Sequence, residues 1–237
     1  MERIFIVPYR DKIKEMKELN EYLEKLFKLK NWNSENTDVI FSHQNDKRMF
    51  NRGAVKNIAF LYAKETYDNY KDIDFIFNDI DIFPNGNIEI PYKTEKGVVS
   101  HYYGFLNTLG GIFVIKGVDF EKSKGFPNFW AWGWEDNEIL KRCLNNNINI
   151  DRSIFYPFCH KEIHLNKNNS PLYSPEELTL FMNNKSDNFY DLEDINYIRN
   201  GDMLDIKTFK TKYPIPKYTK IYTGSIKKTL GRSWNLF

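Results

Sequence analysis

The chain has 237 residues, of which 41% are hydrophobic and 28% charged, as is typical of a soluble globular protein. Its net charge is +2 and its lysines are scattered, which excludes the basic stripe expected of a nucleic-acid-binding surface. The two cysteines, Cys143 and Cys159, form no CxxC pattern, which excludes a disulfide framework and predicts reduced thiols. The length allows one substantial core. No linker or repeat divides the sequence, so we expect one domain over residues 1–237.

The N-terminus begins Met-Glu-Arg and passes directly into the apolar stretch 4–7. No basic region followed by a long apolar run is present, so neither a signal peptide nor an integral membrane segment is predicted. We therefore expect a cytoplasmic protein. Asn, Lys and Ile are frequent, as in the AT-rich genomes of many bacteria and large viruses.

The first half alternates short apolar runs with helical patterns. Residues 4–7, 39–41 and 74–77 predict strands, and the three- and four-residue spacing of apolar side chains predicts helices over 11–30 and 53–67. This β-α-β-α-β order predicts an α/β fold with a parallel sheet and crossover helices. Ligands in such sheets bind beyond the carboxyl ends of the strands.

The second half is less regular. Ser174-Pro-Glu-Glu177 has the cap, the first-turn proline and the acids of a helix start. The other predicted elements are a strand at 110–115, a helix at 135–144, a strand at 153–158, a loop at 166–171 and a hairpin-like β segment at 203–222.

Three of the five tryptophans lie within five residues and directly precede a group of acids. A sugar needs both kinds of side chain, because aromatic faces cover its C–H surface and carboxylates bind its hydroxyls. The alternative is an aromatic cluster that closes a core before an acidic helix start, but packing alone rarely places so many tryptophans beside unpaired acids. The residues are Trp130, Trp132, Trp134, Glu135, Asp136 and Glu138.

Asp79-Ile-Asp81 follows a predicted strand. Alternate residues of a strand point the same way, so both carboxylates can face one site, and hard oxygen ligands suit Mn²⁺ or Mg²⁺. A metal there would bridge a diphosphate and stabilise the charge that grows as it leaves. The alternative is a chance pair in an acidic loop, which the apolar runs 75–77 and 82–83 on either side disfavour.

His160 and His164 are spaced i, i+4, which places them on one face of either a helix or a strand. A downstream histidine could complete a metal shell begun by Asp81; the alternative is a structural or exposed pair. Glu135 and Asp136 open a predicted helix, whose dipole keeps an N-terminal carboxylate ionised, as a general base requires. A capping role is the alternative there, and the two roles are compatible.

Five motifs in order resemble the β1,4-galactosyltransferase family, which has the GT-A fold and inverts its donor sugar. The resemblance implies a mixed, mostly parallel, Rossmann-like sheet with flanking helices. It also divides the chain into a nucleotide-binding part, about 1–84, and a donor- and acceptor-binding part, about 85–237. The similar segments are Val7-Pro-Tyr-Arg10, Phe50-Asn-Arg-Gly53, Asn78-Asp-Ile-Asp-Ile-Phe-Pro84, Leu109-Gly-Gly-Ile112 and 125–138, with Leu204–Ile206 and Tyr218–Tyr222 resembling the last strands.

The resemblance implies a role for each matching position. Asp136 would be the catalytic base, and Asp81 would bind Mn²⁺ with His164, with His160 as a further candidate. The nucleotide would contact Pro8, Tyr9, Arg10, Phe50, Arg52 and Asp79. The donor and acceptor sugars would contact Thr108, Gly110, Gly111, Trp132, Gly133, Glu135 and Asn137.

Four positions depart from the family pattern. Ala131 and Trp134 replace glycines, and Asn137 replaces an aspartate in the acceptor pocket. Thr108 stands where the family commonly has a tyrosine that crowds the C2 substituent of the donor. The smaller threonine would leave room for an N-acetyl group.

The sequence therefore predicts a metal-dependent inverting glycosyltransferase. It would move Gal, GalNAc or GlcNAc from a UDP-sugar to a hydroxyl of a glycan, glycolipid or glycoprotein acceptor, giving a β-linked product. One alternative is a glycan- or nucleotide-sugar-binding module that kept the GT-A fold without turnover, which the presence of Asp136 disfavours. Another is a nucleotide phosphohydrolase, which would give the tryptophans no task.

Overall fold

The computed structural model describes residues 1–165 and 172–221. Its helices are α1 (Ile13–Lys30), α2 (Arg52–Thr66), α3 (Gly117–Ser123), α4 (Glu135–Asn145) and α5 (Pro175–Met182), with 3₁₀ turns at Tyr70–Asp72 and Phe189–Asp191. Its strands are β1 (Arg3–Tyr9), β2 (Thr37–Gln44), β3 (Asp74–Asn78), β4 (Ile82–Pro84), β5 (Val98–Gly104), β6 (Ile112–Lys116), β7 (Asn149–Asp151), β8 (Tyr156–Pro157), β9 (Ile163–Leu165), β10 (Leu172–Tyr173), β11 (Glu193–Asn200), β12 (Met203–Lys210) and β13 (Lys220–Ile221).

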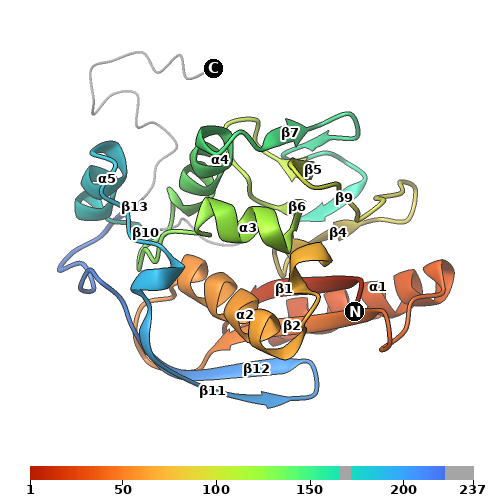
Figure 1. The fold of residues 1–237 in the computed structure, drawn as a ribbon, viewed down its shortest axis with the longest axis horizontal. Coiled ribbons are helices and arrows are strands. Elements are labelled where there is room, and N and C mark those ends of the chain that lie inside the picture. Colours follow the sequence, from red (N-terminus) through yellow and green to blue (C-terminus); the bar gives the residue numbers. More distant parts are fainter. Residues whose placement is uncertain (166–171, 222–237) are drawn as a thin grey trace.

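One large sheet runs through the molecule in the order β11-β12-β2-β1-β3-β6-β5-β7, with β8 paired to β5 (Figure 1). The pairs β12–β2, β2–β1, β1–β3, β5–β7 and β5–β8 are parallel, whereas β11–β12, β3–β6 and β6–β5 are antiparallel. The predicted β-α-β-α-β start and the mixed, mostly parallel sheet are therefore confirmed. Two small antiparallel pairs, β4–β9 and β10–β13, lie outside it.

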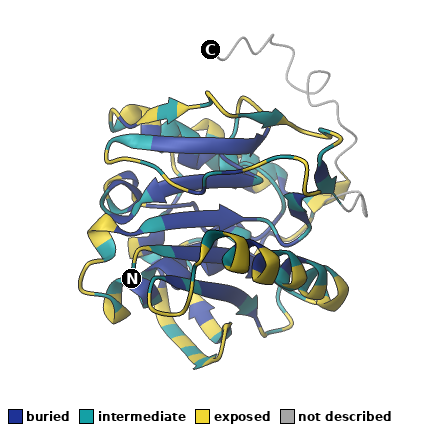
Figure 2. Cartoon of the chain, turned by 90° about the vertical axis from the view of Figure 1, so that its right-hand side faces the viewer, coloured by how far each residue is buried: buried dark blue, intermediate teal, exposed yellow. Residues whose placement is uncertain are grey.

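Alternation along β1 divides the core into two layers. Ile4 and Ile6 belong to the apolar cluster on the α2 side, whereas Phe5 and Val7 belong to the cluster that α1 covers with Leu19, Leu23 and Leu26. Both faces of the strand are buried, which explains its continuous apolar sequence. Figure 2 shows the buried strands and the exposed outer face of α1. Within the described residues, no helix has the length and apolar character needed to span a bilayer.

Several elements of the second half differ from the sequence prediction. The predicted strand 153–158 is only β8, and β5, β7 and β11 were not predicted. β5 buries polar Ser100 and His101, and β11 alternates exposed and half-buried residues, so neither gives a clear apolar signal. The segment 203–222 was predicted as a hairpin, but β12 pairs with the preceding β11. The predicted loop 166–171 and residue 222 lie outside the described residues.

The N-terminus of α2 is locked against residues 126–128. The cap residue Asn51 accepts the Ala54 N–H at 2.8 Å and donates to the Asn128 carbonyl at 2.8 Å. Asn57 donates to the Phe126 carbonyl and accepts the Phe126 N–H, at 2.8 and 2.9 Å. These bonds fix the rotation of α2 relative to the aromatic-acidic segment that follows residue 128.

Gly53→Ala should destabilise the protein, because an added Cβ would lie 1.9 Å from the Pro127 carbonyl oxygen. Such overpacking against backbone costs roughly 1–3 kcal/mol or more, and urea unfolding measures the loss. Thr66→Ala, at the exposed end of the same helix, is the control and should change stability by less than about 0.5 kcal/mol. Equal stabilities of the two variants would contradict the close packing.

Candidate active site

The backbone of residues 109–111 joins two of the predicted acidic residues. The Asp79 N–H donates to the Gly111 carbonyl at 3.0 Å, just beyond the end of β3. The Leu109 N–H donates to the Asp136 carbonyl at 2.8 Å, in the first turn of α4. The structure thus brings together four predicted site residues, Asp79, Gly110, Gly111 and Asp136.

Gly110 has no space for a side chain, because Asp136 lies directly over it. A Cβ at Gly110 would be 2.4 Å from Asp136 Oδ2. Gly111 has a φ of +78° and faces the Tyr103 carbonyl, which a Cβ would approach to 2.5 Å. Close approach to the carboxylate and to backbone therefore explains the glycine pair.

A buried cation that the sequence motifs did not predict, Lys56 of α2, lies between these acids. Its Nζ lies 3.3 Å from Asp136 Oδ1 and 3.9 Å from Asp79 Oδ1, and its side chain is only 3% exposed. A signal for it existed, since Lys56 is the single charged residue in the stretch 53–63. A lone charge on a helix that packs on a sheet needs a buried partner.

Lys56, Asp79 and Asp136 shift one another's pKa values. Burial raises the pKa of Asp136, the Lys56 ammonium opposes that rise, and the Glu135 carboxylate adds to it. Burial likewise raises the pKa of Asp79, again against the pull of Lys56. Although burial lowers the pKa of Lys56, its carboxylate neighbours outweigh that effect and raise it, so the ammonium stays charged.

Asp81 and His164 have features that fit a cation. Asp81 Oδ2 accepts a bond from the Lys12 ammonium at 2.6 Å, so the carboxylate already faces a positive charge. Phe83 of β4 follows Asp81 by two residues and pairs with His164 of β9. The two rings stack with their centroids 4.4 Å apart. His164 Nε2 is buried without a hydrogen-bond partner in the described part of the chain, and Glu18 Oε2 lies 3.8 Å away. A hard oxygen and an unpaired imidazole nitrogen are suitable donors for Mn²⁺.

His160 does not share a helix or strand with His164, so the expectation that both lie on one face of a single element is wrong. It lies in the turn before β9, packs edge-on against Tyr156 at 5.0 Å, and its Nδ1 accepts the Glu162 N–H at 3.3 Å. In residues 1–165 and 172–221, no three His, Cys, Asp or Glu side chains form a cluster able to hold a metal ion. The predicted roles of Asp81, His164 and His160 as metal ligands remain predictions.

The tryptophans divide between core and site. Trp130 is a core residue, because it stacks on Phe209 at 5.3 Å, donates from Nε1 to Thr211 at 3.0 Å and lies under the Arg48 guanidinium. Trp132, Gly133 and Trp134 are half-buried. The core alternative therefore holds for Trp130.

Two buried polar atoms beside Asp136 have no partner among the described residues. Trp134 stacks on Phe181 at 5.6 Å, yet its Nε1 is unpaired, and Oε2 of the buried Glu135 is also unpaired. Trp134 has a φ of +71°, which is strained for any residue with a bulky side chain. The family resemblance places a glycine at this position. Buried unpaired polar groups and strain cluster at ligand sites.

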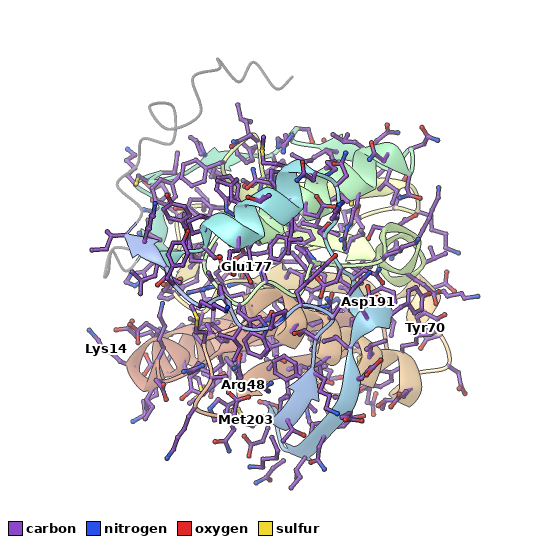
Figure 3. The ribbon with its side chains drawn as sticks, turned by 90° about the vertical axis from the view of Figure 1, so that its left-hand side faces the viewer. Lys14, Arg48, Tyr70, Glu177, Asp191 and Met203 are labelled. Carbon is purple, nitrogen blue, oxygen red and sulfur yellow. The ribbon has the colours of Figure 1, made fainter. Side chains whose placement is uncertain are left out.

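Glu177, labelled in Figure 3, lies in the first turn of α5 and binds the start of the aromatic segment. Its two carboxylate oxygens accept the N–H groups of Trp130 and Ala131 at 2.6 and 2.9 Å. Ser174 caps the helix by accepting the Glu177 N–H at 3.2 Å, as the sequence predicts. One buried carboxylate therefore ties α5 to the segment that leads to Asp136.

The predicted nucleotide residues lie at the carboxyl ends of β1 and β3 and at the start of α2. Tyr9 packs against His43 at 4.9 Å, and Arg10 donates to the Arg48 carbonyl. The Arg52 guanidinium lies 4.9 Å from the Phe50 ring, and its charge acts on both Asp79 and Asp136. Pro8 and Tyr9 are the last two residues of β1.

Two predicted sugar-contacting residues, Thr108 and Asn137, are connected by the loop 105–108. Asn137 Nδ2 donates to the Asn107 carbonyl at 2.8 Å, and the half-buried Thr108 donates to the Phe105 carbonyl at 3.3 Å. The loop therefore lies beside the first turn of α4.

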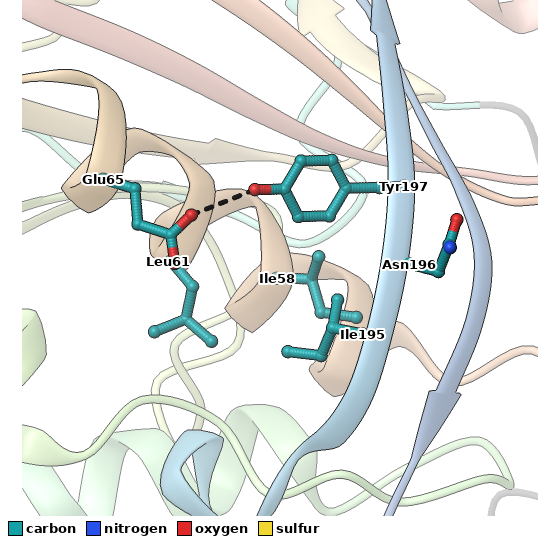
Figure 4. A pocket seen from close by; sticks show the side chains of 6 residues that line it. All are labelled: Ile58, Leu61, Glu65, Ile195, Asn196 and Tyr197. Atoms are coloured by element: carbon teal, nitrogen blue, oxygen red, sulfur yellow. Dashed lines mark hydrogen bonds between the residues drawn. The ribbon is translucent and has the colours of Figure 1, made fainter.

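The site does not coincide with two surface pockets elsewhere on the molecule. One, of about 310 Å³, lies between α2 and β11, where Tyr197 donates to Glu65 at 3.1 Å (Figure 4). The other, of about 260 Å³, lies near the N-terminus and β2. None of the predicted site residues lines either pocket.

Comparison with known proteins places the chain in a family. The domain described as "N-terminal region of glycosyl transferase group 7" matches residues 2–94, and the one described as "N-terminal domain of galactosyltransferase" matches residues 94–164. The chain belongs to this galactosyltransferase family. The family resemblance seen in the sequence motifs is thereby confirmed.

Relatives extend the match along the chain. Xylosylprotein 4-beta-galactosyltransferase of Caenorhabditis elegans is 29% identical over 62% of this chain and 52% of its own length. Beta-1,4-galactosyltransferase 7 of Drosophila melanogaster is 22% identical over 81% of this chain and 61% of its own length. The chain thus spans between about half and three-fifths of these two relatives.

Solved structures share the fold. The catalytic domain of Drosophila beta1,4-galactosyltransferase 7 complexed with xylobiose matches with a TM-score of 0.69 and 17% identity, over 87% of this chain and 94% of that one. A mutant of the same enzyme, complexed with manganese, UDP-Gal and xylobiose, matches with a TM-score of 0.67. The GT-A fold predicted for this galactosyltransferase family member is confirmed.

Glu177 should make stability depend on pH in a way that Glu177→Gln removes. Burial raises the pKa of Glu177 from 4.5 to about 7. Between these values the folded state binds more protons than the unfolded state, so its contribution to stability falls as pH rises. Urea unfolding at about pH 5 and about pH 8 should show a larger fall for the native protein than for Glu177→Gln.

The exposed neighbour Glu176 provides the matched control, and Glu176→Gln should keep the native pH dependence. If all three proteins lose stability in parallel, the carboxylate of Glu177 does not titrate as described.

Proposed function

We propose that this chain is a metal-dependent, inverting glycosyltransferase that transfers a hexose or N-acetylhexosamine from a UDP-sugar to an acceptor hydroxyl. One observation carries the proposal. The Asp-x-Asp segment and the candidate base meet at one ammonium, 3.9 Å from Asp79 and 3.3 Å from Asp136. Family membership and the neighbours bound to UDP-Gal, manganese and xylobiose support the same reaction class.

Asp136 is the proposed base. It lies in the first turn of α4, where the helix dipole favours the ionised carboxylate, and its side chain remains 27% exposed. An ionised, partly exposed carboxylate can accept the proton of an acceptor hydroxyl as that oxygen attacks the anomeric carbon. A single displacement with one base inverts the anomeric centre.

Asp81 and His164 are the proposed metal ligands, with His160 as a further candidate. A bound Mn²⁺ or Mg²⁺ would stabilise the negative charge that develops on the leaving UDP. Asp81 supplies a carboxylate that already holds the Lys12 ammonium, and His164 supplies the unpaired Nε2. Lys12 would have to give up its bond to Asp81 when the metal binds.

Glu135, Trp132 and Trp134 are proposed to surround the donor sugar. The unpaired Glu135 Oε2 can accept a sugar hydroxyl, and the half-buried indoles can cover apolar sugar faces. Residues 109–111 lie directly against Asp136, because a Cβ at Gly110 would be 2.4 Å from Asp136 Oδ2. These contacts would exclude water from the anomeric carbon.

Asp136→Asn should reduce the rate of sugar transfer by roughly 10²–10⁴-fold, because the amide cannot accept the proton. The test is UDP release with Mn²⁺ across UDP-sugars and an acceptor panel, together with calorimetric UDP binding, which should be unchanged. Chelation with EDTA should stop native turnover, and added Mn²⁺ should restore it. Asp68→Asn, at an exposed position, is the control for the charge change.

Native-like transfer by Asp136→Asn would exclude it as the base. UDP release without any acceptor, at full rate, would instead favour a nucleotide hydrolase. Binding of UDP and Mn²⁺ with no transfer to any acceptor would favour a binding module.

Thr108 is proposed to admit an N-acetyl group at C2 of the donor. We therefore expect UDP-GalNAc or UDP-GlcNAc to be used at least as well as UDP-galactose. Thr108→Tyr should lower kcat/KM for the N-acetylated donors by roughly 10–200-fold and spare UDP-galactose. Thr108→Ser, which keeps the site small, is the control, and strict use of UDP-galactose by the native enzyme would refute the assignment.

A further inference from the structure

Lys56 is a buried charge that the proposed mechanism does not yet use. The residue as a whole is 2% exposed, on a helix whose neighbouring residues 53–55 and 57–60 are all buried. Burying an ammonium is costly unless charged partners compensate for it. Its partners are the two acids of the site, Asp79 and Asp136.

The exposures show which side of the site each charge occupies. The carboxylates are 33% and 27% exposed, whereas the ammonium is 3% exposed. The ammonium therefore faces the protein interior, and the carboxylates face the surface from which ligands arrive. The Phe126 ring, 4.6 Å from Nζ, covers the cation further. Lys56 is thus placed to act on the acids rather than on a substrate.

Local packing leaves Lys56 little freedom to move. Gly53 abuts the Pro127 carbonyl, and Asn57, the next residue after Lys56, bonds to Phe126 in both directions. The same segment, 126–128, leads directly to the residues that carry Asp136. The helix that supplies the cation and the chain that supplies the base are therefore held by one set of contacts.

We propose that Lys56 is a positioning residue that ties Asp136 to Asp79, keeping the base ionised and aimed beside the Asp-x-Asp segment. This inference rests on the proposed function, because Asp136 matters as a base only if sugar transfer occurs. Helix α2, through Lys56, would thereby fix the position of the base Asp136 relative to Asp79 of the Asp-x-Asp segment.

The charges around Asp136 support this role. Lys56 and Arg52 approach from α2, Glu135 precedes Asp136 on α4, and Asp79 approaches from the end of β3. Burial and the two acids favour the protonated form of Asp136, which cannot act as a base. Among the opposing groups, Lys56 is the one in hydrogen-bond contact.

Lys56→Met and Lys56→Gln remove the charge and should move the acid limb of the pH profile of kcat/KM upward by about one unit or more. A higher pKa leaves less ionised Asp136 at low pH, so activity falls most there. Below the limb, one unit corresponds to about a tenfold loss. Lys64→Met is the matched control, since Lys64 lies on the same helix and pairs with Glu121 at 2.5 Å, away from the site.

If Lys56 were purely structural, its neutral variants would lose the same fraction of kcat/KM at every pH, and the acid limb of the profile would not move. That result would overturn the proposal. Lys56→Arg keeps the charge and should retain the native limb. If neither neutral variant folds, the pH profile of Lys56→Arg is the test. An acid limb displaced from that of the native protein would contradict the role proposed for Lys56.

Carbon-13 NMR titration of labelled aspartate separates this inference from the proposed function, since it needs no turnover. The Asp136 signal, assigned by its loss in Asp136→Asn, should titrate at higher pH in Lys56→Met than in the native protein. An unchanged Asp136 pKa would overturn the inference even if transfer is observed. A raised pKa in a protein that transfers no sugar would leave the Lys56–Asp136 coupling intact and refute only the proposed function.

Discussion

The site depends on the close fit between the start of α2 and residues 126–128. Gly53 allows the Pro127 carbonyl to approach the helix, and Asn51 and Asn57 hold the same segment by hydrogen bonds. Because these contacts are short and directional, they fix the helix in position and in rotation. One consequence is that Lys56 lies under the two acids, and another is that the chain leaves residue 128 in a defined direction toward α4.

Two further carboxylates show how the aromatic-acidic segment is supported. Glu177 satisfies two N–H groups at its start, and Asp187 Oδ1 accepts the Asn128 N–H at 2.8 Å. Both acids are buried, so each is costly unless fully bonded. The segment that carries Trp132, Trp134 and Asp136 is therefore held at its base, while Trp134 Nε1 and Glu135 Oε2 remain unpaired in the described structure. Rigid support below unsatisfied polar atoms is the arrangement expected of a binding site.

The Asp-x-Asp segment was recognisable from sequence because its chemistry is local. Two acids at alternate positions after an apolar strand predict a metal ion at the end of that strand. In the structure Asp81 accepts a bond from the Lys12 ammonium, and the metal site remains a prediction. The histidines were less predictable, since a four-residue spacing fits several elements. His164 lies on β9 beside β4, whereas His160 lies in the preceding turn. That His164, and not His160, pairs with β4, the strand that follows Asp81, depended on strand pairing, which the spacing does not contain.

Local sequence patterns predicted the first three strands, the first two helices and the cap of α5, because apolar periodicity and capping chemistry act over a few positions. The glycines at 110 and 111 entered only through the family resemblance, and the close approaches that require them are visible only in the fold. Local patterns did not predict β5 or β11, because β5 buries the polar residues Ser100 and His101 and β11 alternates exposed with half-buried residues. Only the tertiary structure showed that Trp130 packs in the core and that Lys56 joins Asp79 to Asp136. The bonds from Lys56 to Asp136 and from Trp130 to Thr211 link residues that are 80 and 81 positions apart in the chain. The role of a buried charge or ring depends on the side chains that surround it in space. Those neighbours come from distant parts of the chain and meet only when the protein folds.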